Sequence, residues 1–416
     1  MALLDKFDMY PELYGQILAH GENPFGVCMD EVVSATRAMI NGRETILAGT
    51  NNYMGLTFDQ SSIDAAKDAL DRHGTGTTGS RFANGTYAEH RQLETDLAQF
   101  LGLSHCIVFS TGYQANLGAI SALAGPEDVI LMDADCHACI YDGCKLSGAT
   151  IVRFRHNSAA DLDKRLSRLD PAQKGRLVIV EGMYSMFGDV APLGELAEAA
   201  HRHGAYFYVD EAHSFGSFGP NGRGAAEAQG VLDQVDFYSS TFSKSLSSIG
   251  GFCASNHDAF EFVRSTSRPY MFTASMSPAN VSSVRAALAQ IAAQPHLRDA
   301  LWRNAERLHA GLSAQGFDLC AAPSPVVAVR MPNKEAAIAG WNALLAAGVY
   351  VNLAIPPGTP NAASLLRLSM SAAHTDAEID AICEAFRSVG QLLADAGAAR
   401  GGAGQVASQA AAAPAT

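Results

Sequence analysis

The sequence has few cationic residues and no long apolar run. It contains 29 Lys and Arg against 42 Asp and Glu among 416 residues, which gives a formal net charge of -13. Because nucleic-acid affinity depends largely on cationic side chains that neutralise phosphates, this balance argues against a nucleic-acid partner. Apolar runs stay well below the roughly 20 residues that a membrane-spanning helix needs, so at most peripheral membrane contact is expected.

Cysteine is also scarce and irregularly spaced, at positions 28, 106, 136, 139, 144, 253, 320 and 383. Such scatter in a long chain is typical of reduced thiols, so a cytoplasmic enzyme is expected rather than a disulfide framework. Cys136, His137, Cys139 and Cys144 lie close together, but their spacing matches no usual zinc pattern. We therefore expect no metal site.

Two short motifs suggest nucleotide chemistry and fail on context. The letters Asp-Glu-Ala-His at 210–213 also occur in nucleic-acid helicases, but phosphate binding there needs a Gly-Lys-Ser/Thr turn, and the sequence contains no Gly-Lys pair. The run "GTGTTG" at 74–79 fits the dinucleotide fingerprint letter for letter. That fingerprint works only between a strand and a helix, whereas this run follows a predicted helix. We expect a flexible loop near a substrate instead.

Helical and strand-like segments alternate from about residue 60 to 255. Short apolar runs predict strands at 106–110, 129–133, 150–154, 177–182, 206–210 and 235–240. Buried strands that alternate with helices indicate an α/β fold with a mainly parallel sheet. In such sheets ligands bind at the carboxyl ends of the strands.

The predicted organisation has four parts. Residues 1–59 form an N-terminal segment and residues 60–290 a large domain. Residues 291–395, where strands near "VVAVRM" and "LLRLSM" alternate with helices, form a smaller α+β C-terminal domain. The Ala/Gly-rich stretch 396–416 lacks an apolar period and is expected to be a disordered tail, with an Ala-rich helix as the alternative.

Polar residues that follow the predicted strands fit pyridoxal phosphate. This cofactor needs a lysine amine for a Schiff base and an acidic partner for its pyridine nitrogen, roles that suit Lys244 and Asp210. Thr241 and Ser243, beside Lys244, could bond the phosphate. The predicted helix start at Gly112–Tyr113 offers amides and a dipole that favour an anion, and His137 could stack on the ring.

Several long motifs resemble the α-oxoamine synthase family of pyridoxal-phosphate enzymes over residues 20–392. They are "VDEAHSFGSFGPNGRG", "TFSKSLSSIGGF" and "RPYMFTASMSP". The runs "NNYMGLTFD", "GSRFANGTYAEH", "EGMYSMFGDVAPL" and "VYVNLAIPPGTP" resemble the branch that condenses L-serine with palmitoyl-CoA to 3-oxosphinganine, CoA and carbon dioxide, the first step of sphingolipid synthesis. The resemblance implies a fold-type I, aspartate-aminotransferase-like structure and a homodimer with active sites at the subunit interface.

The resemblance also implies residue roles. Lys244 becomes the Schiff-base lysine, Asp210 the partner of the pyridine nitrogen, and His213 a contact of the phenolic oxygen, while His137 stacks on the ring and holds the substrate carboxylate. The remaining matches are cofactor contacts at Gly112, Tyr113, Ser185 and Thr241, a phosphate contact made from the neighbouring subunit by Thr273, and positions near the substrate carboxylate at Asn52 and Arg367.

One position departs from the family pattern. Bacterial relatives usually carry Arg before the Pro-Pro of "IPPGTP", where this chain has Ile355. Since that arginine is associated with the amino acid's carboxylate, the task could shift to Arg367 or the amino-acid preference could change. Three alternatives stay open: a sibling synthase that uses glycine or alanine, a transaminase on the same fold, and an inactive partner subunit.

Overall fold

The computed structural model describes residues 3–8, 10–19, 21–170, 173 and 175–410, and the chain divides into two compact units. The large unit comprises Asn51–Arg303 with Ser371–Ala373. The small unit comprises Met1–Thr50, Asn304–Met370 and His374–Thr416. Each unit is described separately below.

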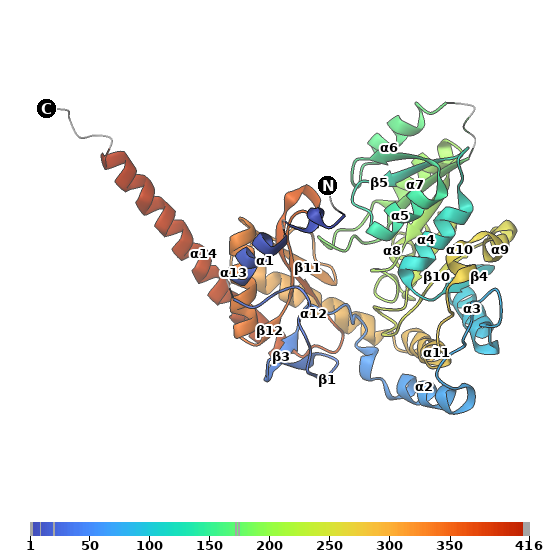
Figure 1. Ribbon diagram of the computed structural model, residues 1–416, viewed down its shortest axis with the longest axis horizontal. Coiled ribbons are helices and arrows are strands. Elements are labelled where there is room, and N and C mark those ends of the chain that lie inside the picture. The colour runs from blue at the N-terminus through green and yellow to red at the C-terminus, as the bar shows by residue number, and fades with distance from the viewer. Residues whose placement is uncertain (1–2, 9, 20, 171–172, 174, 411–416) are drawn as a thin grey trace. The chain divides into compact units, whose positions relative to one another are not determined.

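A seven-stranded sheet forms the centre of the large unit (Figure 1). Its order is β4-β10-β9-β8-β7-β5-β6, and all neighbours are parallel except those of β10, which runs antiparallel to both β4 and β9. The strands are β4 (His105–Phe109), β5 (Val129–Asp133), β6 (Thr150–Phe154), β7 (Arg176–Glu181), β8 (Tyr206–Asp210), β9 (Phe237–Thr241) and β10 (Gly251–Ser255). The predicted α/β fold of the fold-type I class is confirmed, and each predicted strand is present within a residue or two.

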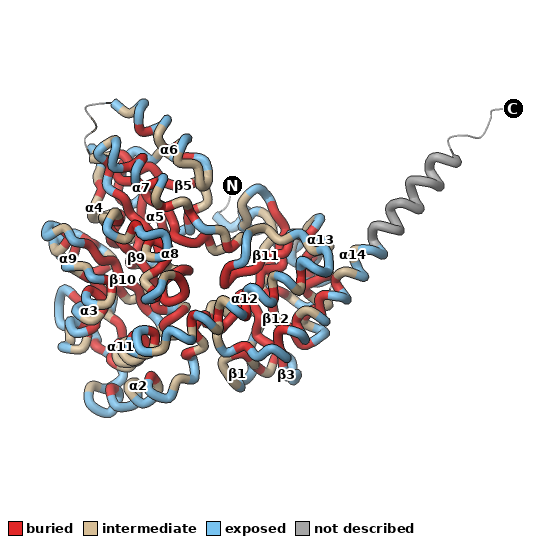
Figure 2. The backbone as a smooth tube through the Cα atoms, turned by 180° about the vertical axis from the view of Figure 1, so that it is seen from behind, coloured by how far each residue is buried: buried red, intermediate tan, exposed pale blue. Residues whose placement is uncertain are grey.

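Helices pack on this sheet in two groups. Helix α4 packs on α5 and on strands β9 and β10, whereas α6 packs on α7. Figure 2 shows the strands between them as buried backbone. The helices of the large unit are α2 (Gln60–His73), α3 (Ala88–Leu101), α4 (Gly112–Leu123), α5 (Ala138–Ser147), α6 (Ala159–Leu166), α7 (Leu193–Arg202), α8 (Ala225–Ala228), α9 (Val263–Thr266), α10 (Arg268–Phe272) and α11 (Pro278–Ala293), with 3-10 turns η2 (Leu56–Phe58), η3 (Leu232–Gln234) and η4 (Asp258–Phe262).

Complete burial explains why the parallel strands are so apolar. All five residues of β5 and of β9 are buried, and so are the last five of β7. A strand covered on both faces has no solvent side, so it reads as a continuous apolar run rather than an alternating one. Acidic residues stand where three of these strands end, since Asp133, Glu181 and Asp210 are the last residues of β5, β7 and β8.

The small unit holds two further sheets. One has the order β1-β2-β3-β12 and the other the antiparallel order β11-β14-β13. Its elements are η1 (Asp5–Phe7), α1 (Tyr10–Leu18), β1 (Glu31–Ser34), β2 (Arg37–Ile40), β3 (Arg43–Leu47), β11 (Val326–Met331), α13 (Lys334–Ala346), β12 (Val349–Tyr350), β13 (Asn352–Ala354), η5 (Pro360–Ala362), β14 (Ser364–Ser369) and α14 (Asp376–Ala410), while α12 (His296–Ala314) runs across the boundary between the units.

Strand β12 pairs in parallel with β3, and this pairing joins the N-terminal residues to the C-terminal part of the chain. Residues 1–50 thus cluster with the small unit, whereas the sequence had suggested a separate segment 1–59. Residues 396–410 of the predicted disordered tail belong to helix α14, which agrees with the helical alternative, and residues 411–416 lie outside the described residues. Within the described part of the chain, the helices lack the combined length and apolarity that crossing a bilayer requires.

Candidate active site

A cavity of about 350 Å³ lies in the large unit at the carboxyl ends of the parallel strands. Eight residues singled out from the sequence line it, and they come from turns after β4, β5, β8 and β9. They are Gly112, Tyr113, His137, Asp210, His213, Thr241, Ser243 and Lys244. The parallel order of the sheet gathers these turns at one edge although they span more than a hundred residues of sequence.

Hydrogen bonds from neighbouring residues fix the side chain of Asp210 at the end of β8. Its side chain is 4% exposed and accepts hydrogen bonds from the amide of Asn116 (Nδ2 to Oδ2, 2.6 Å) and from the backbone N–H of Ala212 (2.8 Å). The amide oxygen of Asn116 accepts from the hydroxyls of Tyr208 (2.7 Å) and Ser239 (2.8 Å). Those two bonds orient the amide so that its NH₂ group faces Asp210, which holds the carboxylate rigidly.

His213 and His137 face the same cavity from different loops. The Nδ1 atom of His213 lies 2.7 Å from the hydroxyl of Tyr53, which is completely buried. His137 is the N-cap of α5, where its Nδ1 accepts from the backbone N–H of Cys139 at 3.2 Å. Although His137 is accessible to solvent, partial burial in the cavity wall lowers its pKa, and the positive charge of Lys244 adds to this against the opposing effect of Asp210. A neutral, flat ring is therefore available at this wall.

Helix α4 begins at the cavity and offers an anion site. Its N-cap Thr111 accepts a hydrogen bond from the N–H of Gln114, while the first amides of a helix have no partner within the helix. Gly112 stands so near Thr241 that an added Cβ would lie 2.6 Å from its Oγ1 atom. That hydroxyl lies 2.9 Å from the hydroxyl of Ser243. Free amides, two hydroxyls and the positive end of a helix dipole together fit a phosphate group.

Four other predicted residues do not line this cavity. Asn52 lies beside the Lys244 loop, where its Oδ1 accepts from the hydroxyl of Ser247 at 2.9 Å. Thr273 accepts a hydrogen bond from Gln114 (Nε2 to Oγ1, 3.2 Å) near the start of α4. Ser185 is in the turn after β7. Arg367 belongs to β14 in the small unit, is 6% exposed, and donates to the hydroxyl of Ser369 at 2.9 Å.

The sequence analysis missed three residues of this site. Asn116 and Tyr53 hold Asp210 and His213, and Glu181, at the end of β7, lines the cavity and accepts a hydrogen bond from the backbone N–H of His137. Glu181 carries the same signal as Asp210, an acidic residue directly after a buried strand, and could have been found by it. Asn116 and Tyr53 lie within otherwise ordinary segments and needed the fold.

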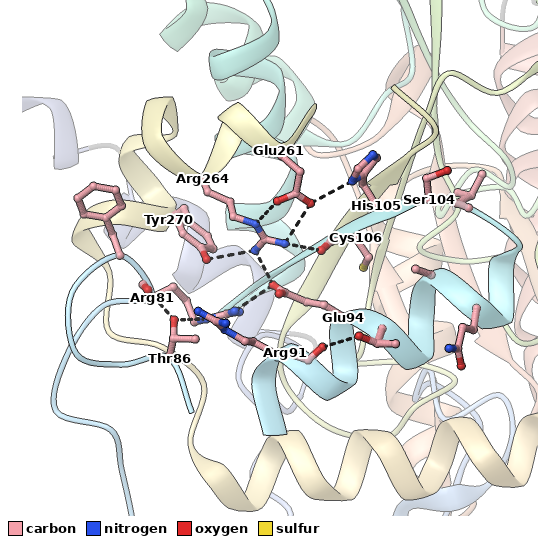
Figure 3. Close-up of a pocket in the computed structure, with 15 residues that line it drawn as sticks. Arg81, Thr86, Arg91, Glu94, Ser104, His105, Cys106, Glu261, Arg264 and Tyr270 are labelled. Atoms are coloured by element: carbon pink, nitrogen blue, oxygen red, sulfur yellow. Dashed lines mark hydrogen bonds and ion pairs between the residues drawn. The ribbon is translucent and has the colours of Figure 1, made fainter. Parts of the chain in front are cut away.

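A larger cavity, of about 800 Å³, lies at the start of β4 between α3 and α9 (Figure 3). Four of its charged groups form ion pairs with one another. The buried carboxylate of Glu94 lies 3.0 Å from Arg81 and 2.9 Å from Arg264, and Arg264 also pairs with Glu261. These ion pairs connect residues of the cavity wall to one another, and Lys244 is not among the lining residues. The larger cavity is therefore not the candidate active site, although it has the greater volume.

Pyridoxal phosphate fits the smaller cavity on these observations. The phosphate would lie at the start of α4, the carboxylate of Asp210 would face a cationic ring nitrogen, and Lys244 would supply the amine.

All eight cysteines are free thiols. Among the described residues, groups of three or more His, Cys, Asp or Glu side chains arranged to hold a metal ion are absent.

Comparison with known proteins agrees with this chemistry. Residues 43–386 match the family of class I and II aminotransferases. A serine palmitoyltransferase of Caulobacter vibrioides is 54% identical over 94% of this chain and 97% of its own length. The solved structure of the Sphingomonas wittichii serine palmitoyltransferase superposes with a TM-score of 0.92 at 51% identity, covering 94% of this chain and 99% of that one.

A high-resolution structure of a serine palmitoyltransferase with the pyridoxal-phosphate internal aldimine superposes with a TM-score of 0.91 at 50% identity, over 94% of this chain and all of that one. The family match over residues 43–386 includes every residue that lines the cavity. The chain therefore belongs to the class I and II aminotransferase family of pyridoxal-phosphate enzymes and, within it, to the serine palmitoyltransferase group of acyltransferases.

Proposed function

We propose that the chain catalyses the decarboxylative condensation of L-serine with palmitoyl-CoA to 3-oxosphinganine, with release of CoA and carbon dioxide. The observation that carries this proposal is the cavity with Lys244, Asp210, His213 and His137 in a chain that is 54% identical to a serine palmitoyltransferase. Pyridoxal phosphate, when bound, supplies an electron sink for the α-carbon of an amino acid. The chain's own residues would hold the cofactor, orient the amino acid and move its α-proton.

The proposed roles follow from the contacts of each residue. Asp210, held by Asn116 and Ala212, would place its carboxylate opposite the ring nitrogen of the bound cofactor. His213, held by Tyr53, donates to the phenolic oxygen. His137 would present its ring for stacking and its Nε2 for the substrate carboxylate. Lys244 would supply the amine that links to the cofactor and would move the α-proton. The phosphate is bound by Gly112, Tyr113, Thr241 and Ser243, while Ser185 is a further cofactor contact and Asn52 and Arg367 bind near the substrate carboxylate.

We also propose a homodimer in which Thr273 reaches the phosphate site of the partner subunit. Thr273 lies near the start of α4, which is the phosphate end of the cavity in its own subunit. A contact across a two-fold axis close to this end would place the same residue near both sites. Sedimentation of the cofactor-loaded protein tests this, since a fully active monomer would exclude the role of Thr273.

A cytoplasmic location also remains a prediction.

The central test measures thiol release. L-serine with palmitoyl-CoA should release CoA, and the protein should show a visible absorption band that borohydride abolishes. Lys244→Ala should lose both, whereas Lys145→Ala, which removes a lysine whose side chain is 70% exposed, should keep both. A Lys244→Ala variant that keeps the band and releases thiol would exclude the proposed covalent link.

A substrate panel separates the proposal from its siblings. Glycine, alanine and serine are each tested with acetyl-, succinyl- and palmitoyl-CoA, with free thiol as the readout. Serine with palmitoyl-CoA should be fastest, and Ile355→Arg should tighten serine by up to about ten- to a hundredfold if the added charge reaches the carboxylate. A faster reaction with glycine and a short acyl group would assign a sibling synthase instead, and pyruvate formed without thiol would assign a transaminase.

A further inference from the structure

His156 lies outside the cavity, in the loop that follows strand β6. It connects the loop that carries the cavity residue His137 to the turn that follows Glu181, the cavity residue at the end of β7. Its Nδ1 is 2.8 Å from Oδ1 of Asp133, the last residue of β5, and its Nε2 is 2.7 Å from Oδ2 of Asp189, in the turn after β7. The ring of Tyr184 packs edge-on against it, with centroids 4.4 Å apart. One side chain thus links the ends of three neighbouring strands.

The ring of His156 carries a positive charge. Both nitrogens face carboxylate oxygens, which only accept hydrogen bonds, so both nitrogens must donate. Burial lowers the pKa of His156, but the hydrogen bonds to Asp133 and Asp189 outweigh it and raise this pKa to about 10. A third carboxylate, Asp135, lies 3.9 Å away, and the uncharged ring of Tyr184 covers another side. The groups that face His156 therefore all favour the charged form or are neutral.

The first carboxylate holds the His137 loop. Asp133 is completely buried, and it accepts hydrogen bonds from the backbone N–H groups of Asp135 (2.9 Å) and Asn157 (2.8 Å). Asp135 stands two residues before His137, the N-cap of α5. The position of His137 at the cavity wall therefore depends on a short segment that Asp133 and His156 fix.

The second carboxylate holds the Ser185 turn. Asp189 accepts from His156 and also from the side-chain amide of Asn157 at 2.8 Å. Its backbone oxygen accepts from the N–H of Tyr184 at 2.9 Å, which closes the turn that contains Ser185. The hydroxyl of Tyr184 in turn accepts from the backbone N–H of the cavity residue Glu181 at 3.4 Å.

We propose that His156 is a positioning residue of this active site: its doubly bonded ring fixes the loop that carries His137 against the turn that carries Ser185. It acts through those loops, because it does not line the cavity itself. The inference rests on the proposed roles of His137 and Ser185. It assigns to His156 the alignment of one cavity wall.

The test compares His156→Gln with His105→Gln. His105 is a matched control, because its ring also bridges two carboxylates, Asp258 at 3.1 Å and Glu261 at 3.2 Å. Figure 3 shows its contact with Glu261. Its side chain is 21% exposed against 24% for His156. His105 begins β4, at the end of the strand opposite to the cavity. Glutamine is neutral, and both of its N–H donors belong to one nitrogen. It therefore cannot donate to two carboxylates on different sides, as the two ring nitrogens of histidine do.

We expect His156→Gln to weaken pyridoxal phosphate, shift its absorption band, and lower kcat/KM for serine by roughly ten- to a hundredfold in folded, cofactor-saturated enzyme. His105→Gln should change each quantity less than twofold. Asp189→Asn, which removes the negative charge on the turn side of His156 and also alters the acceptor of Asn157, should reproduce part of the loss. The double variant His156→Gln/Asp189→Asn should be no worse than His156→Gln. The Asp189→Asn result stands alone if His156→Gln fails to fold.

Two outcomes would overturn the inference. The first is wild-type cofactor affinity, absorption and kinetics in folded His156→Gln, or in Asp189→Asn if His156→Gln does not fold. The second is an equal loss in His156→Gln and His105→Gln. Cofactor affinity and absorption need no substrate. An incorrect substrate assignment would therefore leave those two readouts intact, and the two proposals fail separately.

Discussion

Substituting Gly112 by alanine should disturb the phosphate end of the cavity. The added Cβ would lie 2.6 Å from both Cβ and Oγ1 of Thr241 and 3.4 Å from its Cα, which is about 1 Å inside ordinary contact for the first two atoms. Thr241 cannot simply rotate away. Its Cβ is fixed to the backbone of β9, and its hydroxyl donates to the backbone oxygen of Gly250 at 3.0 Å.

Two opposing effects set the size of the change. Alanine is favoured over glycine in a helix by up to about 1 kcal/mol, and Gly112 is the first residue of α4. Overpacking costs about 1–3 kcal/mol, and the upper part of that range applies where backbone must move. The net loss should be about 1–2 kcal/mol, which corresponds to a fall in Tm of about 2–8 °C for a unit of this size.

Thermal unfolding without cofactor and titration with pyridoxal phosphate measure this effect. Because the same strain separates α4 from β9, cofactor affinity should fall about 5- to 30-fold. Gly76→Ala is the control, since an added Cβ there has nothing within 4 Å. Equal Tm and equal cofactor affinity in Gly112→Ala and the wild type would show that the close approach to Thr241 is not a constraint.

Two further predictions concern buried charge. Glu94→Gln should lower the free energy of unfolding by about 3–5 kcal/mol, because two arginines lose their shared buried partner, whereas Asp68→Asn, which breaks an exposed pair, should cost less than about 1 kcal/mol. Urea unfolding compares them, and similar losses would contradict the burial argument. His156, with a pKa raised from 6.5 to about 10, should contribute stability fully below pH 6.5 and lose it as the pH rises toward 10. That contribution to the free energy of unfolding is roughly 3–5 kcal/mol. Unfolding curves over a pH series measure it. If the free energy of unfolding of His156→Gln decreased with rising pH as steeply as that of the wild type, the reasoning would be refuted.

The sequence predicted the fold well because burial leaves a direct mark on it. Strands such as 129–133 and 206–210 are covered on both faces and therefore appear as apolar runs with a polar residue at the end. Strand β10 was missed, because "GFCAS" is short, begins with glycine and contains two small residues. Its place between β4 and β9 follows from backbone pairing alone, which leaves no periodic signal.

Residues that act through others were harder to predict. The pairing of β3 with β12 joins positions about 300 residues apart, and a β pairing at that distance has no local signature. Tyr53 and Asn116 are likewise identified only by what they touch, His213 and Asp210. Residues that line the cavity could be predicted from strand ends, but their supporting contacts depend on the tertiary structure.

Glu181 and Asp210 show where sequence reasoning reaches its limit at this site. Both end buried parallel strands, both line the cavity, and they are register partners on β7 and β8. Burial raises the pKa of Glu181 well above its usual range, and the negative charge of Asp210 adds to this. The carboxylate of Asp210 accepts hydrogen bonds from a side-chain amide and from a backbone N–H. We therefore expect the two acidic groups at equivalent strand ends to take different roles, with Asp210 rather than Glu181 as the carboxylate that a cationic ring nitrogen would meet.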